Sequence, residues 1–299
     1  EEIYDLNFDK QIVIDKAFRE AFKVMIYKIV DKKDRYIINN TSLNKIKSLI
    51  ESFEITDEKF INNNYKSQFN VEFSKKKTLK YIEEKNIISS IPNEIKIIFI
   101  PVLIDLEKNQ LNYFSQNSFI KKWNINSNNY FLLNYIIPNE DIEDYSIIKK
   151  NLINIENYDF EEIIKKYNMD NHIILLMFKN SDQLKILSKI KFGKKNMIKN
   201  RTYKNFNFNN EKEINEVILE IKESYEDKWK SINKLNTSLA LAIRLSLDSK
   251  NINLSKNIEK ALLKIDLISD FKIEKFDNQK IIYKIIFNSS PDKFIEIMR

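Results

Sequence analysis

Apolar residues recur at three- and four-residue intervals near the start of the chain. The positions that would share one face of a helix are Ile14, Phe18, Ala21, Met25 and Ile29. A shorter helix is predicted over 43–50. Two strands follow at 52–61 and 65–73, joined by asparagines that tolerate left-handed turns. A helix capped by Ser74 completes a helix-plus-hairpin unit.

The pattern changes after Pro92, because residues 95–104 are apolar on both faces and predict a central strand. Further strands are predicted at 131–137 and 172–178, and a capping-box pattern at Asp159 opens a helix between them. Residues 184–208 alternate around Gly193, which predicts a two-stranded ribbon that turns at Gly193-Lys194. A long amphipathic helix follows. The middle segment is therefore interpreted as a sheet covered by helices.

The last segment has the order strand, helix, strand, strand, helix, which is typical of a ferredoxin-like unit that lacks its final strand. The predicted elements lie at 238–247, 254–264, 267–276, 280–287 and from residue 291 onward. We expect the absent strand to leave an open edge near 280–287, ready to pair with a partner strand. The fold class is α+β, with three small units at 1–91, 92–234 and 235–299.

A short sequence, Tyr-Lys-x-x-Phe-Asn, occurs in the second strand of both the first and the last unit, at 65–70 and 283–288. An internal repeat is one interpretation. Coincidence is the other, because the chain is strongly biased toward isoleucine, asparagine and lysine.

Composition supports a folded chain and removes several classes of chemistry. Hydrophobic residues make up 43% of the sequence, well above the content of disordered chains. The absence of cysteine excludes disulfides, thiolate metal sites and cysteine nucleophiles. A single glycine excludes the usual phosphate-binding loops, and no serine lies in a nucleophile elbow. We therefore name no catalytic residue and expect no cofactor. An enzyme of unknown class stays open as an alternative, because paired carboxylates have no sequence signature.

One histidine and one cluster of acidic residues are candidates for metal or catalytic sites. His172 is the only histidine and opens an apolar strand, which favours a structural role. The acidic residues Glu140, Asp141, Glu143 and Asp144 follow Pro138 and supply the oxygen ligands that a hard cation such as calcium prefers. Their spacing matches no calcium loop, and carboxylates at a helix N-terminus explain the cluster more simply. No metal site is predicted.

The net charge of +7 is concentrated between residues 183 and 210, where eight basic residues occur without any Asp or Glu. Aromatic residues such as Phe192, Tyr203, Phe206 and Phe208 are interleaved with them, a mixture suited to single-stranded nucleic acid or an anionic lipid surface. The alternative is a solvated ribbon whose aromatic residues face the core. The candidate binding residues, here called the basic ribbon, are Lys189, Lys191, Lys194, Lys195, Lys199, Arg201, Tyr203 and Lys204.

No apolar run is long enough to span a membrane. The sequence starts at Glu1, which is compatible with a mature chain from which a leader has been removed. Export is thus permitted, and a cytoplasmic location is the alternative.

The order of landmarks resembles a family of exported proteobacterial envelope proteins known as domain of unknown function 2066 (DUF2066). The resemblance extends over almost the whole chain, and its positions here are Arg19, Tyr65, Pro101, Trp123, Pro138, Asp141, Asp144 and Trp229. Two departures are Glu140, where the family has glycine, and Lys166, where the family often has arginine before Tyr167.

The resemblance implies a periplasmic protein with no known activity and no catalytic residues to carry over. It favours an envelope protein or an anionic membrane surface as the partner and makes nucleic acid less fitting. The first hypothesis is therefore a non-enzymatic envelope binding or scaffolding protein that uses strand edges and the basic ribbon. The second is a nucleic-acid-binding protein that uses residues 183–210.

Overall fold

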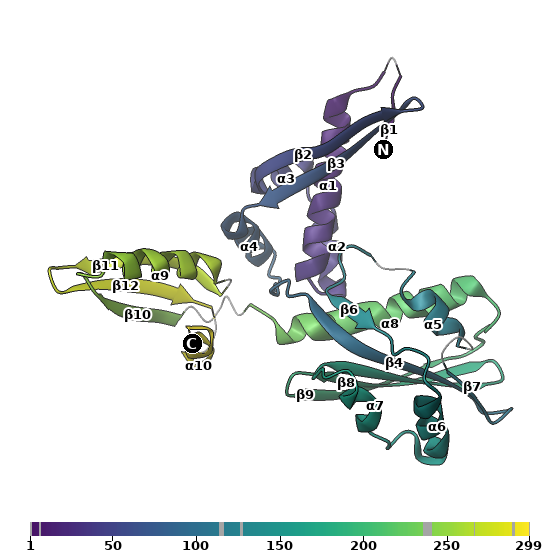
Figure 1. Ribbon diagram of the computed structural model, residues 1–299. Helices are drawn as coiled ribbons and strands as arrows, with labels where there is room; N and C mark the ends of the chain where they lie inside the picture. Colours follow the sequence, from purple (N-terminus) through teal and green to yellow (C-terminus); the bar gives the residue numbers. More distant parts are fainter. Residues whose placement is uncertain are drawn as a thin grey trace. The chain divides into compact units, whose positions relative to one another are not determined.

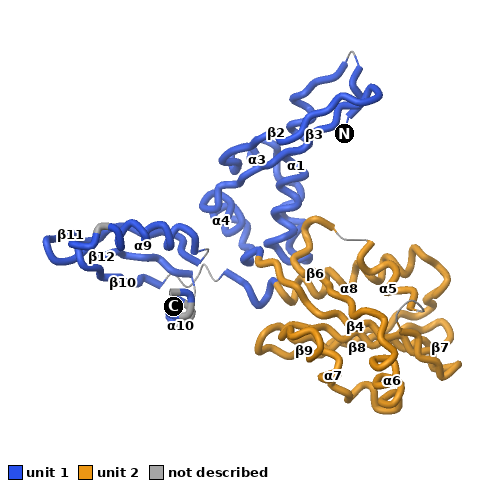
Figure 2. Tube along the Cα trace, viewed as in Figure 1, with its two compact units in different colours: residues 1–92, 230–299 blue, residues 93–229 orange. Residues whose placement is uncertain are grey.

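The computed structural model of the chain describes residues 2–5, 7–113, 117–125, 128–235, 241–265, 267–288 and 291–298. These residues form helices and three mostly antiparallel sheets, so the α+β prediction is confirmed. The chain divides into two compact units (Figure 2): unit 1 contains residues 1–92 and 230–299, and unit 2 contains residues 93–229.

The first segment of unit 1 packs a long helix against one face of a three-stranded sheet ordered β1-β3-β2 (Figure 1). Its elements are β1 (Glu2–Ile3), α1 (Lys10–Ile29), a short 3₁₀ turn (Lys32–Asp34), α2 (Arg35–Asn39), α3 (Leu43–Leu49), β2 (Ile50–Ile61), β3 (Asn64–Phe73) and α4 (Lys75–Glu84). Asp9 is the N-cap of helix α1, because its side chain accepts a hydrogen bond from the Gln11 N–H. Asn62 and Asn63 both have positive φ and form the predicted hairpin turn.

The core of this segment joins the apolar face of α1 to β3. Phe18, Phe22 and Ile26 of α1 are buried. In β3, Tyr65 is buried and alternate residues such as Phe69 and Phe73 are half-buried, as the predicted alternation requires.

The last segment of unit 1 has the β-α-β-β-α order of a ferredoxin-like unit, and its sheet order is β10-β12-β11. Its elements are β10 (Leu241–Asp248), α9 (Ile252–Lys264), β11 (Ile268–Phe276), β12 (Lys280–Phe287) and α10 (Pro291–Met298). Residues 238–240 of the predicted first strand lie outside the described residues.

The expectation of an open edge at residues 280–287 is wrong. These residues form β12, the central strand, which pairs with β10 on one side and β11 on the other. In a complete ferredoxin-like sheet the last strand lies beside the first, so the vacant position adjoins β10. The strand was predicted correctly, but its place in the sheet was not.

Unit 2 contains a six-stranded sheet with the order β5-β4-β7-β8-β9, in which β6 also pairs with β4. The strands are β4 (Ile95–Asp105), β5 (Gln110–Asn112), β6 (Leu133–Ile136), β7 (His172–Asn180), β8 (Gln183–Phe192) and β9 (Lys195–Tyr203). Helices α6 (Ile142–Lys150) and α7 (Glu161–Lys165) cover one face, and α5 (Ser118–Trp123) and α8 (Glu211–Ile232) cover the other (Figure 1). The predicted sheet covered by helices is therefore confirmed.

Pro101 lies inside the central strand β4, where a residue without an N–H is normally excluded. The Ile98 N–H donates to the Asn171 carbonyl, so alternation directs the nitrogen of Pro101 away from β7. On that other side β6 pairs with 95–98 and β5 with 103–105, and Pro101 falls between them. The missing donor therefore interrupts neither ladder.

The helix predicted at Asp159 is present as α7, but it does not begin with a capping box. Asp159 accepts from the Glu161 N–H at 3.1 Å, but the residue that caps α7 is Phe160, with a φ of 61°. Phe160 is buried, so packing holds its left-handed backbone in place.

Candidate functional site

The residues of the basic ribbon lie on the β8–β9 hairpin and directly after it, and the hairpin turns at Gly193-Lys194, as predicted. Gly193 has a φ of 55°, a left-handed conformation that favours glycine, and its N–H donates to Asn171 Oδ1 at 2.8 Å. Lys194 lies in this turn and Lys204 follows β9. Strand β9 pairs only with β8 among the described strands and is an edge strand.

The hairpin divides the basic side chains between the two faces of the sheet. Lys199 donates to Ser224 Oγ of α8, and Arg201 is paired with Glu220 of the same helix. Lys189 instead donates to the Tyr158 carbonyl, near the start of α7 on the opposite face. The basic ribbon is therefore not one continuous positive surface.

The aromatic residues of the basic ribbon are not exposed stacking platforms. Tyr203 is half-buried and its hydroxyl donates to Glu220 at 2.9 Å. Phe206 is 5% exposed and packs against Phe119 and Phe208. Single-stranded nucleic acid needs accessible aromatic faces, so this geometry does not favour the nucleic-acid hypothesis.

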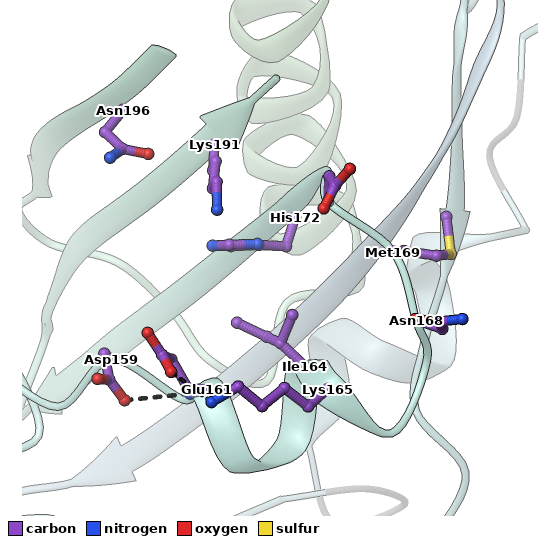
Figure 3. Close-up of a pocket in the computed structure, with 10 residues that line it drawn as sticks. Asp159, Glu161, Ile164, Lys165, Asn168, Met169, His172, Lys191 and Asn196 are labelled. Atoms are coloured by element: carbon purple, nitrogen blue, oxygen red, sulfur yellow. Dashed lines mark hydrogen bonds and ion pairs between the residues drawn. The ribbon is translucent and has the colours of Figure 1, made fainter. Parts of the chain in front are cut away.

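A polar pocket of about 550 Å³ opens on the α7 face of the sheet (Figure 3). Three of its residues form a row across neighbouring strands, because Lys191 of β8 lies directly opposite both His172 of β7 and Asn196 of β9. Asp159 and Glu161 line the other side, beside Lys165. Of the basic ribbon, the pocket contains Lys191.

The charges around this pocket are partly compensated. Lys165 and Glu161 form an ion pair at 2.7 Å, and Asp159 is engaged with the Glu161 N–H. His172 Nδ1 is buried and makes no hydrogen bond of normal geometry. Burial lowers the pKa of His172, and the neighbouring Lys191 charge lowers this pKa further, whereas the Asp170 carbonyl opposes the change. His172 is therefore mainly neutral at pH 7.

The titratable groups of the pocket are lysines, carboxylates and one histidine. Among the described residues that line it there is no serine, threonine or cysteine. What the pocket offers is polar contact, through the Lys191 ammonium and the Asn196 amide.

The acidic cluster surrounds a lysine. Lys166 Nζ lies 2.9 Å from Asp141, 2.8 Å from Glu143 and 2.6 Å from Asp144. These three carboxylates raise the pKa of Lys166, and Lys166 lowers the pKa of Asp141. Across the described ranges, no group of three or more histidine or carboxylate side chains is arranged to hold a metal ion. Lys166 thus supplies the cation that the acidic residues require.

The positions that carry the family resemblance are distributed over both units. Arg19 is exposed on α1, whereas Tyr65 and Pro138 are buried. Trp123 stacks on Phe99 with ring centroids 4.1 Å apart. Trp229 Nε1 donates to the Asn93 carbonyl at 2.6 Å, which ties together the last and first residues of unit 2.

One part of this set does converge. Asp141 and Asp144 share Lys166, and the neighbouring Tyr167 hydroxyl accepts from the Asn139 N–H at 3.2 Å. The segment after Pro138 is thereby fastened to the end of α7. These contacts describe a structural joint.

Sequence reasoning missed two buried charged side chains on the α8 face, Lys222 and Glu226. Lys222 is 1% exposed, donates to the Trp123 carbonyl, and lies 5.4 Å from the Trp123 ring centroid and 5.5 Å from that of Tyr135. Burial lowers the pKa of Lys222 to about 8, and Glu226 opposes this effect. Glu226 accepts from the N–H groups of Leu132 and Leu133. The available signal was a Lys and a Glu four residues apart on the apolar side of a helix.

The edges of the sheets form the remaining candidate surface. The residues of β10 on the core face of the sheet are only half-buried, although their cross-strand neighbours in β12 are buried. These core-face residues are Leu241, Ile243, Leu245 and Leu247. An edge strand whose core side is incompletely covered fits the place where a further strand would lie.

The fold and these surfaces define an α+β chain whose last described sheet has the strand order of an incomplete ferredoxin-like unit. Comparison with protein-family models, curated proteins and solved structures found no match for this chain. The resemblance to DUF2066 therefore stays a prediction. No helix in the described part of the chain has the length and apolar character needed to cross a bilayer.

Proposed function

We propose that this chain is a non-enzymatic binding or scaffolding protein of the bacterial cell envelope, which pairs the free edge of β10 with an extended segment of a partner protein. The observation that carries the proposal is that, among the described strands, β10 pairs with β12 alone and has no strand on its other side. A strand added there would complete the sheet through main-chain hydrogen bonds and cover the half-buried side chains Ile243 and Leu245.

The other long edges are less suited to pairing. Strand β2 carries register shifts near Ile50 and Ile55, and β11 carries shifts near Ile268 and Ile273. Such irregularities twist an edge and discourage added strands. Strand β9 is regular but carries Lys195, which with other basic residues protects an edge against association. Strand β10 pairs with β12 without a shift over its whole length.

The envelope location rests on the resemblance to DUF2066, whose members are exported. The basic ribbon adds an anionic surface as a second class of partner, through Lys194 and Lys195 at its exposed turn. Fractionation of cells that produce the full-length protein tests the location. Recovery in the cytoplasm would contradict the envelope part of the proposal and leave the edge function to be tested separately.

Site-specific photo-cross-linking tests the edge function. A photoreactive amino acid at Ser246, exposed on β10, should capture a protein in living cells. The same amino acid at Lys284, on the central strand, is the matched control and should capture much less. Equal capture from the two positions, or none from Ser246, would contradict pairing at this edge.

A further inference from the structure

The residues of β10 are complementary to themselves when two copies run antiparallel. The strand reads Leu241–Asp248, with apolar residues facing the core and polar residues on the solvent face. Opposed residues in an antiparallel pair point to the same side of the sheet. A two-fold axis that lies midway between a β10 residue and the same residue of the second copy therefore keeps apolar side chains against apolar ones.

The charges select one such register. With Ser246 opposite Ser246 of the second copy, Arg244 lies directly opposite Asp248 of the second copy, and the symmetric contact repeats this pair. On the core side the same register places Leu245 opposite Leu247 of the second copy. A register centred on Arg244 would instead oppose two like charges, which is destabilising.

Arg244 is exposed and pairs with a glutamate of its own sheet. Its Nε and Nη2 lie 2.6 Å and 3.2 Å from the carboxylate of Glu274, which fixes the guanidinium over the solvent face of the sheet. Because Glu274 lies on β11, beyond β12, the exposed Arg244 side chain must turn from Glu274 toward the open edge to reach Asp248 of the second copy.

We propose that the partner of the β10 edge is a second copy of this chain, and that two β10 strands pair around Ser246 into one continuous antiparallel sheet. This inference rests on the proposed function, because it names the occupant of the same edge. The interface is isologous, which is the commonest arrangement in homodimers. It covers Leu245 and Leu247 in both copies and joins two Arg–Asp pairs.

Exchange of the charges provides a direct test by sedimentation of the full chain over a range of concentrations. Arg244→Glu alone places two acidic residues opposite each other, and Asp248→Lys alone places two basic residues opposite each other. Each variant should dimerise about ten- to thirtyfold more weakly than the unaltered chain, since both symmetric pairs become repulsive.

An equimolar mixture of the two variants should recover the original affinity. In the heterodimer, the acidic side chain introduced at position 244 of one chain lies opposite the basic side chain introduced at position 248 of the other. The second pair of the heterodimer is the natural one, Arg244 with Asp248. Both contacts are therefore attractive in the heterodimer, whereas both are repulsive in each homodimer.

Matched controls lie on the opposite edge strand β11. Lys272→Glu and Asp270→Lys make the same kinds of charge change at exposed positions and should leave the dimerisation constant unchanged. A mixture that stays as weak as the single variants, or control variants that weaken dimerisation equally, would overturn the β10 register.

The outcomes also separate this inference from the proposed function. A chain that stays monomeric while Ser246 still cross-links to a different protein overturns the second-copy assignment and supports the edge function. A chain that stays monomeric and gives no cross-link from Ser246 overturns both.

Discussion

Lys166 Nζ lies 2.6 Å from Oδ1 of Asp144, a carboxylate whose side chain is only 1% exposed. The two residues are distant in the sequence, and the contact fastens α6 to the end of α7. Two more exposed carboxylates, Asp141 and Glu143, complete the group around the lysine. The acidic residues after Pro138 thus have a structural role, because they surround and bind Lys166.

Removal of this lysine should destabilise unit 2. Lys166→Met leaves Asp144 buried without its cation, which we expect to reduce the free energy of unfolding by about 2 kcal/mol. This loss is smaller than the cost of breaking a fully buried ion pair, because the Lys166 side chain is 34% exposed. Urea denaturation followed by tryptophan fluorescence measures the change, since both tryptophans are in unit 2.

The control is Lys165→Met, which removes the lysine of an exposed pair with Glu161 and should change stability little. Millimolar calcium should not stabilise the unaltered chain, because Lys166 occupies the acidic group. A clear calcium-dependent rise in the unfolding midpoint would contradict this account and revive the cation site at residues 140–144.

The buried Lys222 predicts how stability depends on pH above neutrality. Its pKa is about 8 in the folded chain and about 10.5 when unfolded. Between these values the unfolded chain binds the proton and the folded chain does not, so stability rises with pH. The gain is about 3 kcal/mol across this window. Below pH 8 both states are protonated, so this group adds no further pH dependence there.

Comparison with Lys222→Met isolates this contribution. Other lysines and tyrosines titrate in the same range, but they do so in both proteins, so the difference between the two pH profiles reports Lys222. Urea denaturation at pH 8 and near pH 10 provides the measurement. Parallel profiles for the two proteins would show that Lys222 is not desolvated in the folded chain.

The single histidine allows the pocket to be tested by NMR. Burial and the Lys191 charge lower the pKa of His172, so its ring signals should titrate below the ordinary value of 6.5. Lys191→Met should move the pKa upward, whereas Lys185→Met, at the far end of β8, should not. The folded chain should also lose stability as pH falls below about 6.5, because the unfolded histidine binds the proton first. A pKa at or above 6.5 would contradict the buried environment.

Local patterns were sufficient for most strands and long helices. Residues 95–104, 172–178 and 280–287 are strands as predicted, and Gly193 marks the hairpin turn. These elements have strong period-two or continuous apolar patterns, or a residue with a special backbone requirement. The short elements β5 and α5 were missed because they lie in an asparagine-rich stretch with little apolar periodicity.

Relations between distant residues were the part that sequence did not reveal. The two-residue turn places Phe192 opposite Lys195, so odd-numbered residues of β8 and β9 point to opposite faces. This alternation places the odd-numbered basic residues of β8 and those of β9 on opposite faces of the sheet. It follows from the register of the hairpin, which the composition of the segment does not give. The contact of Lys166 with Asp144 has no local signature at all. The position of β12 at the centre of its sheet likewise depends on strand order, which alternation along a strand does not encode.

The Tyr-Lys-x-x-Phe-Asn sequences occupy corresponding places in the two segments of unit 1. Tyr65 lies in β3 and Tyr283 in β12, and each of these is the central strand of a three-stranded sheet. Both tyrosines are buried, and their hydroxyls donate to Glu58 at 2.8 Å and Glu259 at 2.6 Å. The two glutamates come from different elements, a strand and a helix, so the tyrosine environments are similar without being identical.

Tyr65→Phe and Tyr283→Phe should each cost about 1 kcal/mol, the usual net value of one intramolecular hydrogen bond. Because the two tyrosines belong to separate sheets, the double variant should show the sum of the two effects. Hydrogen exchange measures this locally: Tyr65→Phe should speed exchange in β2 and β3, and Tyr283→Phe in β10 and β12. Faster exchange in β12 after Tyr65→Phe would contradict this independence, because it would mean that the two sheets share one cooperative unfolding unit.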